Sequence, residues 1–571
     1  MNKITKNIHL IGHIFIIFLI GLAFYSSMII GFSWDEYFHH INGLVRYKFL
    51  TSFGDFEKYD FRNNEFYPGL YDTLSYSFGQ LFFIISKNFY VDNLAELMHL
   101  FNFFFSSLSI LGLFLISKKL FNKEIAIFTT LLTLLNPFFF GHMGMNSKDL
   151  VVFFSMIWFC YFFYKYVTEE KTFKNLIWLS FFIGFGCGTR LTFLVVIFPV
   201  LICGFIYLFK KYESQYFYLT KRFLSHSVVV FLITIFLVII CWPHMIMEIK
   251  NGNFSNFFSL IVKNTISWND GPKIGLINGE YYEVFNTPKT YFLDIVKFRL
   301  PFYSSLLIIL TYVLVFTKTL IVKNETSNFV KKFYIVNVIA FFPILLAIIL
   351  GVNIYDNLRL FLFVIPFFSL IAAISLHQLL YNFKDSWKSK IGLITIFTLF
   401  IFSFYRFILL TPYQYTYVNH SYPSFKESIN KFEHEYWGAS YKELVKKIKK
   451  NYTQKEIENF KIADCGGGDW TLVYYLKKYL GVKRTYSKGK DLDEATHIVM
   501  NNRVFLDVFQ NEYVKDLVND KGEWLIKDME EVVRAPNIKK RCFDYGRFSG
   551  DNEVVVSRDS LALTIFRKVN K

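Results

Sequence analysis

The stretch Ser33-Trp34-Asp35-Glu36-Tyr37-Phe38-His39-His40 follows directly after the first long apolar run of the chain, residues 8–30. Two adjacent carboxylates at the end of a hydrophobic helix are costly unless they face water, a cavity or a substrate. Asp35 and Glu36 therefore either mark the point at which the chain returns to water or belong to an active site at the membrane surface. A second signal on the same face of the membrane is needed to decide.

Composition places the chain among polytopic membrane proteins. It has 571 residues, of which 53% are hydrophobic and 20% aromatic, with a mean hydropathy of +0.33. These values are too apolar for an ordinary soluble protein. The formal charge of +17 comes from Lys and Arg that concentrate in the short connections between apolar runs. Such charges fix orientation in the membrane, so we expect no nucleic-acid partner.

Windows of about 20 apolar residues predict eleven membrane-spanning helices. They cover residues 9–31, 97–117, 124–141, 151–167, 174–189, 191–209, 226–245, 301–321, 333–352, 358–380 and 391–411. The weaker run 70–85 carries Asp72, Ser75, Ser77 and Gln80 and predicts a helix at the membrane surface instead.

The charged connections predict the orientation. Lys clusters fall on alternate connections, beginning with Lys3 and Lys6, so an amino terminus in the cytoplasm places every cluster there. The segments 32–96, 142–149, 246–300 and 353–357 and everything after residue 411 then lie outside. The chemically interesting clusters share this outer face, which is the second signal that the carboxylate pair needs.

Three further clusters lie on the expected outer face. His142 to Asp149 follow a break at Asn136-Pro137, and Asp149 either faces a substrate or caps the next helix. Arg190 ends a glycine-rich turn, where we expect it to meet an anionic group. Tyr355-Asp356-Asn357-Leu358-Arg359 precedes the tenth span, and Arg359 either binds an anion or extends its guanidinium to the membrane interface.

In the order and common side of these motifs the chain resembles the GT-C superfamily of membrane glycosyltransferases. The resemblance is to the family 39 group, which includes protein O-mannosyltransferases and the lipid A aminoarabinose transferase. It rests on Asp35-Glu36 in the first outer loop, Tyr67-Pro68-Gly69-Leu70, Asp149, and Arg359 before Leu362 to Pro366. No His follows Arg359, and Tyr67 to Leu70 lacks the His and second Pro common in the group. The resemblance covers residues 1–411.

The resemblance implies a mainly α GT-C fold and transfer of a monosaccharide from a polyprenyl-phosphate donor to an acceptor hydroxyl, with inversion. Asp35 would be the general base, with Glu36 as a second catalytic candidate. Arg359, Arg190 and Lys148 would bind the donor phosphate, because cations stabilise the leaving group. Asp149, His142 and Tyr355 are further substrate-binding candidates.

The same resemblance implies partners and a location. The partners would be membrane lipid, the lipid-linked donor and a glycan, lipid or protein acceptor. We expect no required cofactor, although His39, His40, His142 and the carboxylates are possible ligands of a divalent metal. The expected location is a bacterial plasma membrane, with the C-terminal domain periplasmic or extracellular.

Residues 412–571 predict an extracytoplasmic α/β domain after a membrane domain of residues 1–411. Short apolar runs at 461–463, 497–500, 524–526, 554–556 and 561–566 predict strands, and the patterns at 441–448 and 472–480 predict helices. The loop Asp464 to Asp469 is glycine-rich but lacks the form of a nucleotide site. The stretch Glu433 to Ser440 either contacts a sugar or packs on the membrane domain. Cys465 and Cys542, the two cysteines of this domain, either form a disulfide, which an oxidising compartment permits, or remain two separate buried thiols.

Two other classes of function stay open from the sequence alone. A transporter or lipid flippase predicts charges near mid-membrane and paired interrupted helices, neither of which is evident. A polymerase or ligase that moves whole oligosaccharides needs the same external base and phosphate site.

Overall fold

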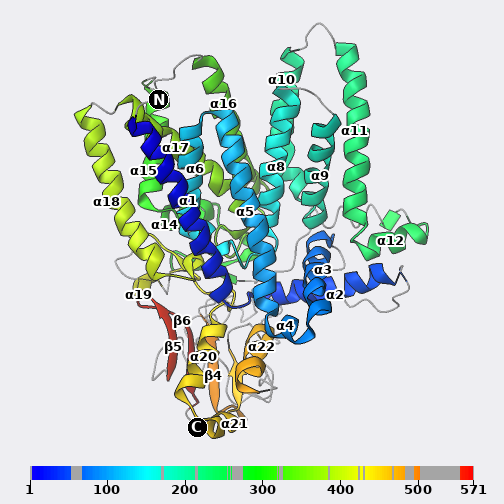
Figure 1. Ribbon diagram of the computed structural model, residues 1–571, viewed down its shortest axis with the longest axis vertical. Coiled ribbons are helices and arrows are strands. Elements are labelled where there is room, and N and C mark those ends of the chain that lie inside the picture. The colour runs from blue at the N-terminus through cyan, green and yellow to red at the C-terminus, as the bar shows by residue number, and fades with distance from the viewer. Residues whose placement is uncertain are drawn as a thin grey trace, which may run out of the picture.

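A bundle of long helices with a small α/β domain at one end makes up the computed structural model (Figure 1). The structure describes residues 3–569 except 53, 55–66, 169–172, 212–215, 254, 257–258, 260–273, 318, 320–325, 384–385, 422–424, 429–430, 466–468, 483–493 and 502–552. The amino terminus lies at the end of the bundle opposite the α/β domain, as an odd number of spans requires.

The long helices confirm the predicted fold class, because each of the eleven predicted spans coincides with a helix. They are α1 (Lys3–Ile29), α5 (Leu94–Leu120), α6 (Lys123–Leu134), α8 (Asp149–Thr168), α9 (Phe173–Thr189), α10 (Phe193–Lys211), α11 (Tyr216–Ile239), α15 (Phe302–Phe316), α16 (Thr326–Leu350), α17 (Ile365–His377) and α18 (Trp387–Leu409). The predicted span 358–380 holds three consecutive elements. The 3₁₀ helix η2 (Arg359–Val364) comes first, α17 follows, and the π-helix η3 (Gln378–Asn382) begins at its end.

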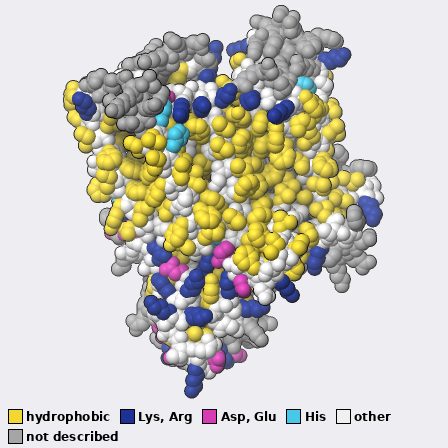
Figure 2. Space-filling view, viewed as in Figure 1, with side chains coloured by type: hydrophobic (Ala, Val, Ile, Leu, Met, Phe, Trp, Pro, Cys, Tyr) yellow, Lys and Arg dark blue, Asp and Glu magenta, His cyan; other side chains and the backbone are white. Residues whose placement is uncertain are grey.

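The length and apolar character of each helix determine whether it can cross a membrane as a single unbroken helix. Among the described residues seven helices are long and apolar enough, and two bent pairs raise the number to nine. The bent pairs join α11 to α12 (Pro243–Lys250) at 106° and α14 (Tyr291–Arg299) to α15 at 115°. Helices α6 and α9, with 12 and 17 residues, are shorter than a full span of about 20. Figure 2 shows the apolar belt that the bundle presents, with Lys and Arg gathered along its upper edge.

Short elements cover the end of the bundle beside the α/β domain. Helix α2 (Trp34–Thr51) crosses the end of the bundle and packs on α3 (Leu70–Ile85), the predicted surface helix, which is followed by α4 (Lys87–Asp92) (Figure 1). The break at Asn136-Pro137 starts α7 (Pro137–His142), where the Asn136 side chain accepts a hydrogen bond from the Phe139 N–H. The remaining elements here are the hairpin β1 (Ile274–Ile277) and β2 (Glu280–Glu283), η1 (Val284–Asn286), η4 (Gln414–Thr416) and α19 (Phe425–Ser428).

The α/β domain contains one four-stranded sheet with strand order β3-β4-β6-β5. Its strands are β3 (Ile462–Asp464), β4 (His497–Asn501), β5 (Val554–Arg558) and β6 (Leu561–Lys568), and its helices are α20 (Tyr441–Asn451), α21 (Gln454–Glu458) and α22 (Asp469–Leu480). Among the strands in the described residues, β3 and β4 pair in parallel and the other pairs are antiparallel. Four of the five predicted strands and both predicted helices are present, and the fifth, 524–526, lies outside the described residues.

The cysteines agree in part with the predicted pairing. Cys465 is disulfide-bonded, whereas Cys160, Cys187, Cys203 and Cys241 are free. The expected partner of Cys465, Cys542, lies outside the described residues.

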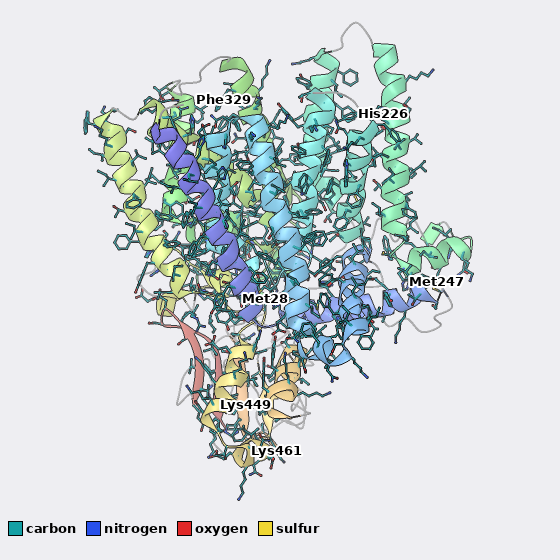
Figure 3. All side chains as sticks on the ribbon, viewed as in Figure 1. Met28, His226, Met247, Phe329, Lys449 and Lys461 are labelled. Atoms are coloured by element: carbon teal, nitrogen blue, oxygen red, sulfur yellow. The ribbon has the colours of Figure 1, made fainter. Side chains whose placement is uncertain are left out.

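The α/β domain is bonded to the end of α1. The Lys442 ammonium donates to the carbonyls of Met28 and Ile30 at 3.0 and 3.1 Å, and the Tyr475 hydroxyl accepts from the Phe32 N–H at 2.7 Å. Figure 3 shows Met28 at the end of the bundle nearest to this domain, whereas Phe329 and His226 lie toward the other end. The residues after Met28 are therefore held by groups from the far end of the sequence.

Candidate active site

Asp35 lies in the first turn of α2, and its position follows from how that helix begins. The Ser33 hydroxyl accepts from the Glu36 N–H, and the Glu36 carboxylate accepts from the Ser33 N–H at 2.9 Å, which is a capping box. The cap fixes the first turn, so Asp35 projects from a rigid helix end rather than from a loop. Its side chain is 34% exposed, the most open of the predicted site carboxylates.

Arg359 is the centre of the site. Its Nη1 donates to Asp35 Oδ2 at 2.8 Å and lies 3.3 Å from Asp356 Oδ2, and its Nε lies 3.7 Å from Asp149 Oδ2. Asp356 and Asn357 have φ of 54° and 63°, so the chain turns sharply before η2 begins at Arg359. This turn brings the guanidinium, whose side chain is 7% exposed, to α2 from 324 residues away in sequence.

Two aromatic rings cover the guanidinium of Arg359. Its central carbon lies 5.4 Å from the ring centroid of Tyr355 and 5.0 Å from that of Trp437. Both rings are buried. Contacts of this kind attract a cation to the ring face, and they also limit the side-chain rotamers that an arginine can adopt.

Asp149 and Arg190 form a second ion pair beside Arg359. Arg190 Nη1 donates to Asp149 Oδ1 at 3.0 Å, and Asn146 Nδ2 donates to Asp149 Oδ2 at 3.1 Å. The cap of α8 comes from Asn146, whose Oδ1 accepts from the Asp149 N–H at 2.9 Å. The Asp149 carboxylate therefore connects the two predicted phosphate-binding arginines instead of capping its helix.

Lys148 lies next to this pair, over the ring of Tyr67 at 4.7 Å. Within the described ranges no carboxylate lies within ion-pair distance of its ammonium. Burial, with smaller effects of Arg190 and Arg46, lowers the pKa of Lys148 to about 8 against the opposite effect of Asp72 and Asp35. Lys148 is therefore a buried cation that is not neutralised by direct contact.

Asp72, Arg46 and His39 form a buried group that the sequence analysis did not single out. Arg46 Nη1 donates to Asp72 Oδ2, and His39 Nδ1 lies 3.0 Å from Asp72 Oδ1. Burial raises the pKa of Asp72, but His39 and Arg46 outweigh it and hold that pKa at about 2. Burial and Lys148 lower the pKa of His39, so its imidazole is neutral near pH 7.

Glu36 is placed differently from Asp35. It is 0% exposed, and besides capping α2 it accepts from Asn102 Nδ2 at 3.0 Å and lies 3.0 Å from His99 Nε2. All of these contacts come from helix ends and buried side chains. The structure thus gives Glu36 the role of fixing α2 against α5, and it offers no exposed oxygen to a substrate.

His142 is also enclosed. Its Nδ1 lies 2.7 Å from the Phe138 carbonyl and its Nε2 lies 3.2 Å from the Tyr436 hydroxyl. Burial lowers the pKa of His142 to about 3. The structure brings Asp35, Asp149, Arg190, Lys148, Arg359 and Tyr355 into one site, with Glu36 and His142 in the packing around it.

Three contributors to the site were missed or left open by sequence reasoning. Asp72 carries a charge on a helix that was interpreted only as lying at the surface. Asp356 stands in the quoted stretch before Arg359 but received no role. Trp437 lies in Glu433 to Ser440, where packing and sugar contact were both open. The tight packing of Trp437 on Arg359 and His142 favours the packing alternative for that residue.

Metal binding was left open by the sequence. The candidates His39, His142 and Asp149 are engaged by Asp72, Tyr436 and Arg190, respectively. In the part of the chain that the structure describes, no group of three or more His, Cys, Asp or Glu residues is arranged to hold a metal ion. That the reaction requires no metal stays a prediction.

Comparisons with known proteins agree with the predicted fold and class of enzyme. Residues 81–242 match the family described as dolichyl-phosphate-mannose-protein mannosyltransferase. The structure is similar to that of ArnT from Cupriavidus metallidurans bound to undecaprenyl phosphate, with a TM-score of 0.50 and 13% identity over 97% of both chains. The chain is a membrane glycosyltransferase of the GT-C fold.

Other matches are weaker. The archaeal oligosaccharyltransferase AglB from Archaeoglobus fulgidus, in complex with an inhibitory peptide and a dolichol-phosphate, gives a TM-score of 0.43 at 11% identity. That match covers 91% of this glycosyltransferase and 72% of AglB. A search of curated protein sequences found no match. The comparisons confirm the predicted fold and the predicted class of enzyme, and they leave the roles of individual site residues as predictions.

Proposed function

We propose that this glycosyltransferase transfers one sugar from a polyprenyl-phosphate donor to an acceptor hydroxyl on the extracytoplasmic face of a membrane, with inversion at the anomeric carbon. The observation that carries the proposal is the 2.8 Å contact between Asp35 and Arg359. It joins a partly exposed carboxylate to a buried guanidinium, which are the two groups that a displacement at a sugar phosphate needs side by side.

The proposed reaction is a single displacement. Asp35 takes the proton of the acceptor hydroxyl while that oxygen forms a bond to the anomeric carbon. The bond from the anomeric carbon to the phosphate oxygen breaks, and its electron pair leaves with the polyprenyl phosphate. Attack from the face opposite the leaving phosphate inverts the anomeric centre. Asp35 then returns its proton to solvent.

The charges around Arg359 support a role for Lys148 in binding the phosphate. Arg359 and Arg190 already contact Asp35, Asp149 and Asp356, so a phosphate that approaches them displaces a carboxylate contact. Lys148 makes no such contact within the described residues and lies in a buried position where electrostatic attraction is strong. We infer that the phosphate meets Lys148 first and that Arg359 turns from its carboxylates to the phosphate as the donor settles.

The names of the matching proteins support a polyprenyl-phosphate donor. The matching family is named for a dolichyl-phosphate mannose donor, and the ArnT structure holds undecaprenyl phosphate. Dolichyl and undecaprenyl phosphates share the long isoprenoid chain and the single phosphate. We propose this shared chemistry for the donor. The acceptor is proposed only as a hydroxyl of a glycan, lipid or protein.

The distribution of Lys and Arg supports the proposed orientation. On the face shown in Figure 2, Lys and Arg line the edge of the apolar belt at the end of the bundle that holds the amino terminus, and others lie on the α/β domain, which is large enough to cross a membrane whatever its charge. Positive connections face the cytoplasm in most membrane proteins. The site then opens on the outer side of a plasma membrane, as we propose for a bacterial cell.

The experiment uses purified protein in lipid nanodiscs with a panel of undecaprenyl-phosphate monosaccharides and with hydroxyl acceptors from lipid, glycan and peptide classes. Mass spectrometry of products from the wild type is expected to show addition of one sugar from one donor. Asp35→Asn removes the base without a change in volume, so turnover is expected to fall by roughly 10²-fold or more. Asp294→Asn, at a partly exposed position of helix α14, is the control and is expected to retain turnover.

Three results would contradict the proposal. Addition of an oligosaccharide in one step would identify a ligase, and transfer by Asp35→Asn at the wild-type rate would remove Asp35 as the base. Movement of lipid-linked sugar across the membrane without bond exchange would favour the transporter alternative. Lipids, glycans and proteins from a deletion strain, compared by mass spectrometry, identify the donor and acceptor together.

A further inference from the structure

The segment Glu433 to Ser440 contacts both the helix that carries Asp35 and the side chain of Arg359. The Trp437 carbonyl accepts from the Trp34 N–H at 2.9 Å, and the Ala439 carbonyl accepts from the Gly31 N–H at 2.9 Å. These two bonds flank the start of α2, which carries Asp35. A Cβ on Gly31 would lie 2.5 Å from the Ala439 carbonyl, so the two backbones meet as closely as glycine allows.

The same segment contacts Arg359 through the side chain of Trp437. The indole ring is 2% exposed and lies 5.0 Å from the guanidinium carbon and 5.2 Å from the ring of His142. Trp437 thus contacts the guanidinium through its ring and the Asp35 helix through its carbonyl. Among the described residues, the indole N–H has no hydrogen-bond partner. A buried N–H without a partner is unfavourable, so the ring contacts with Arg359 and His142 have to hold the indole in this position.

The α/β domain and the end of the bundle hold the segment from both sides. Ser440 donates to Thr564 of strand β6 at 3.1 Å, and the Tyr436 hydroxyl lies 3.2 Å from His142 Nε2. Between them the Ala439 N–H donates to Glu435 Oε1 at 2.8 Å, and the Tyr415 hydroxyl also donates to Glu435. The position of Trp437 therefore depends on the α/β domain as well as on the membrane helices.

We propose that Trp437 is a positioning residue that holds the Arg359 guanidinium in the orientation that accepts the donor phosphate, and that it makes phosphate binding depend on the α/β domain. This inference rests on the proposed function of Arg359. Asp35, Asp149 and Asp356 offer Arg359 competing ion pairs in different directions. The rings of Trp437 and Tyr355 restrict the orientations that the guanidinium can adopt. The guanidinium can therefore turn toward the phosphate instead of pairing closely with a single carboxylate.

The test measures binding of undecaprenyl phosphate to the full-length protein in nanodiscs by native mass spectrometry, together with donor KM and kcat. Trp437→Leu fills much of the space but removes the ring, and it is expected to weaken lipid-phosphate binding by about 10- to 30-fold, the scale of a desolvated cation–π contact. The donor KM should rise by the same factor, with kcat nearly unchanged. Trp437→Phe restores a ring and is expected to bind within about threefold of the wild type. Trp387→Leu, an exposed tryptophan at the start of α18, is the matched control.

A double substitution separates positioning from general support of the fold. If Trp437 acts through Arg359, Trp437→Leu costs little further affinity in an Arg359→Lys background, because contacting residues are not additive. Additive losses, or equal losses in Trp437→Phe and Trp437→Leu, would overturn the inference while leaving Arg359 in the site. Wild-type protein that fails to bind undecaprenyl phosphate, or Arg359→Lys that binds it normally, would refute the proposed function first. Thermal unfolding of each variant identifies any loss that comes from misfolding.

Discussion

Substitution of Arg359 by lysine tests whether the guanidinium binds the donor phosphate. Arg359 reaches Asp35 and Asp356 through Nη1 and approaches Asp149 through Nε, with Trp437 and Tyr355 on its faces. Lysine keeps the charge but ends in one ammonium, so it cannot bind two oxygens in the parallel arrangement of a guanidinium. The substitution therefore changes geometry while the net charge of the site stays constant.

The expected size follows from the contacts that lysine cannot make. One charge-assisted hydrogen bond contributes about 1.5–3 kcal/mol at a desolvated position, and we use about 1.5 because Asp35 is 34% exposed. Loss of the planar stacking on Trp437 adds about 0.5–1.5 kcal/mol. The sum of about 2–3 kcal/mol corresponds to a loss of about 30- to 150-fold in kcat/KM for the donor.

Donor and acceptor kinetics of the purified protein decide the result. The donor KM is expected to carry most of the loss and the acceptor KM little of it. Arg558→Lys is the matched control, because Arg558 forms a two-point contact with Glu443 at 2.6 and 3.2 Å in the α/β domain. That variant is expected to lose stability but to keep donor affinity. Unchanged donor kinetics in Arg359→Lys and Arg359→Ala would mean that the guanidinium only reaches the membrane interface, and the phosphate assignment would be wrong.

Three further predictions concern residues around the site. Glu36→Gln replaces one of the two carboxylate oxygens by an amide NH2, so either the Ser33 N–H or the Asn102 side-chain amide then faces another donor. Thermal unfolding should show a loss of roughly 1.5–3 kcal/mol with turnover partly retained, and normal stability with no turnover would give Glu36 a chemical role. Asp72 has a folded pKa of about 2, below its ordinary value of 3.8, so its carboxylate stabilises the fold above pH 3.8 and this contribution disappears as the pH falls toward 2. The Asp72→Asn variant should therefore unfold at a lower temperature than the wild type near neutral pH, and this difference should shrink in acid. A difference that does not depend on pH would contradict the lowered pKa of Asp72. Mass mapping without reductant should find Cys465 joined to Cys542, and alkylation of both thiols in native protein would exclude that pair.

The membrane fold was predictable from sequence because a spanning helix must satisfy its backbone internally and bury an apolar surface along its length. Apolar runs therefore coincide with all eleven helices, including α6 and α9, which are shorter than a full span. The strands of the α/β domain were predictable for a similar reason, because short apolar runs mark segments that are buried in a sheet. Turns such as the positive-φ pair Asp356 and Asn357 gave no comparable signal.

The sequence predicted which residues belong to the site better than it predicted how they are arranged. Loop positions on one membrane side indicated Asp35, Asp149, Arg190 and Arg359, but which carboxylate faces the Arg359 guanidinium depends on helix phase. The sequence Ser33-x-x-Glu36 carries the signature of a capping box and was the available signal that Glu36 turns inward. Trp437 could not be assigned, because its contact with Arg359 forms only when the α/β domain packs on the bundle.

The bonds at the end of α1 set an order of events during synthesis. The backbone groups between Met28 and Trp34 bond to Trp437, Ala439, Lys442 and Tyr475, which the ribosome adds more than four hundred residues later. Helix α1 precedes these groups in the chain, so the start of the helix that carries Asp35 gains these bonds only after the α/β domain has been made and has packed on the bundle. Nascent chains and carboxyl-terminal truncations that end before Trp437 therefore lack the contacts that hold the start of α2, which carries the proposed base.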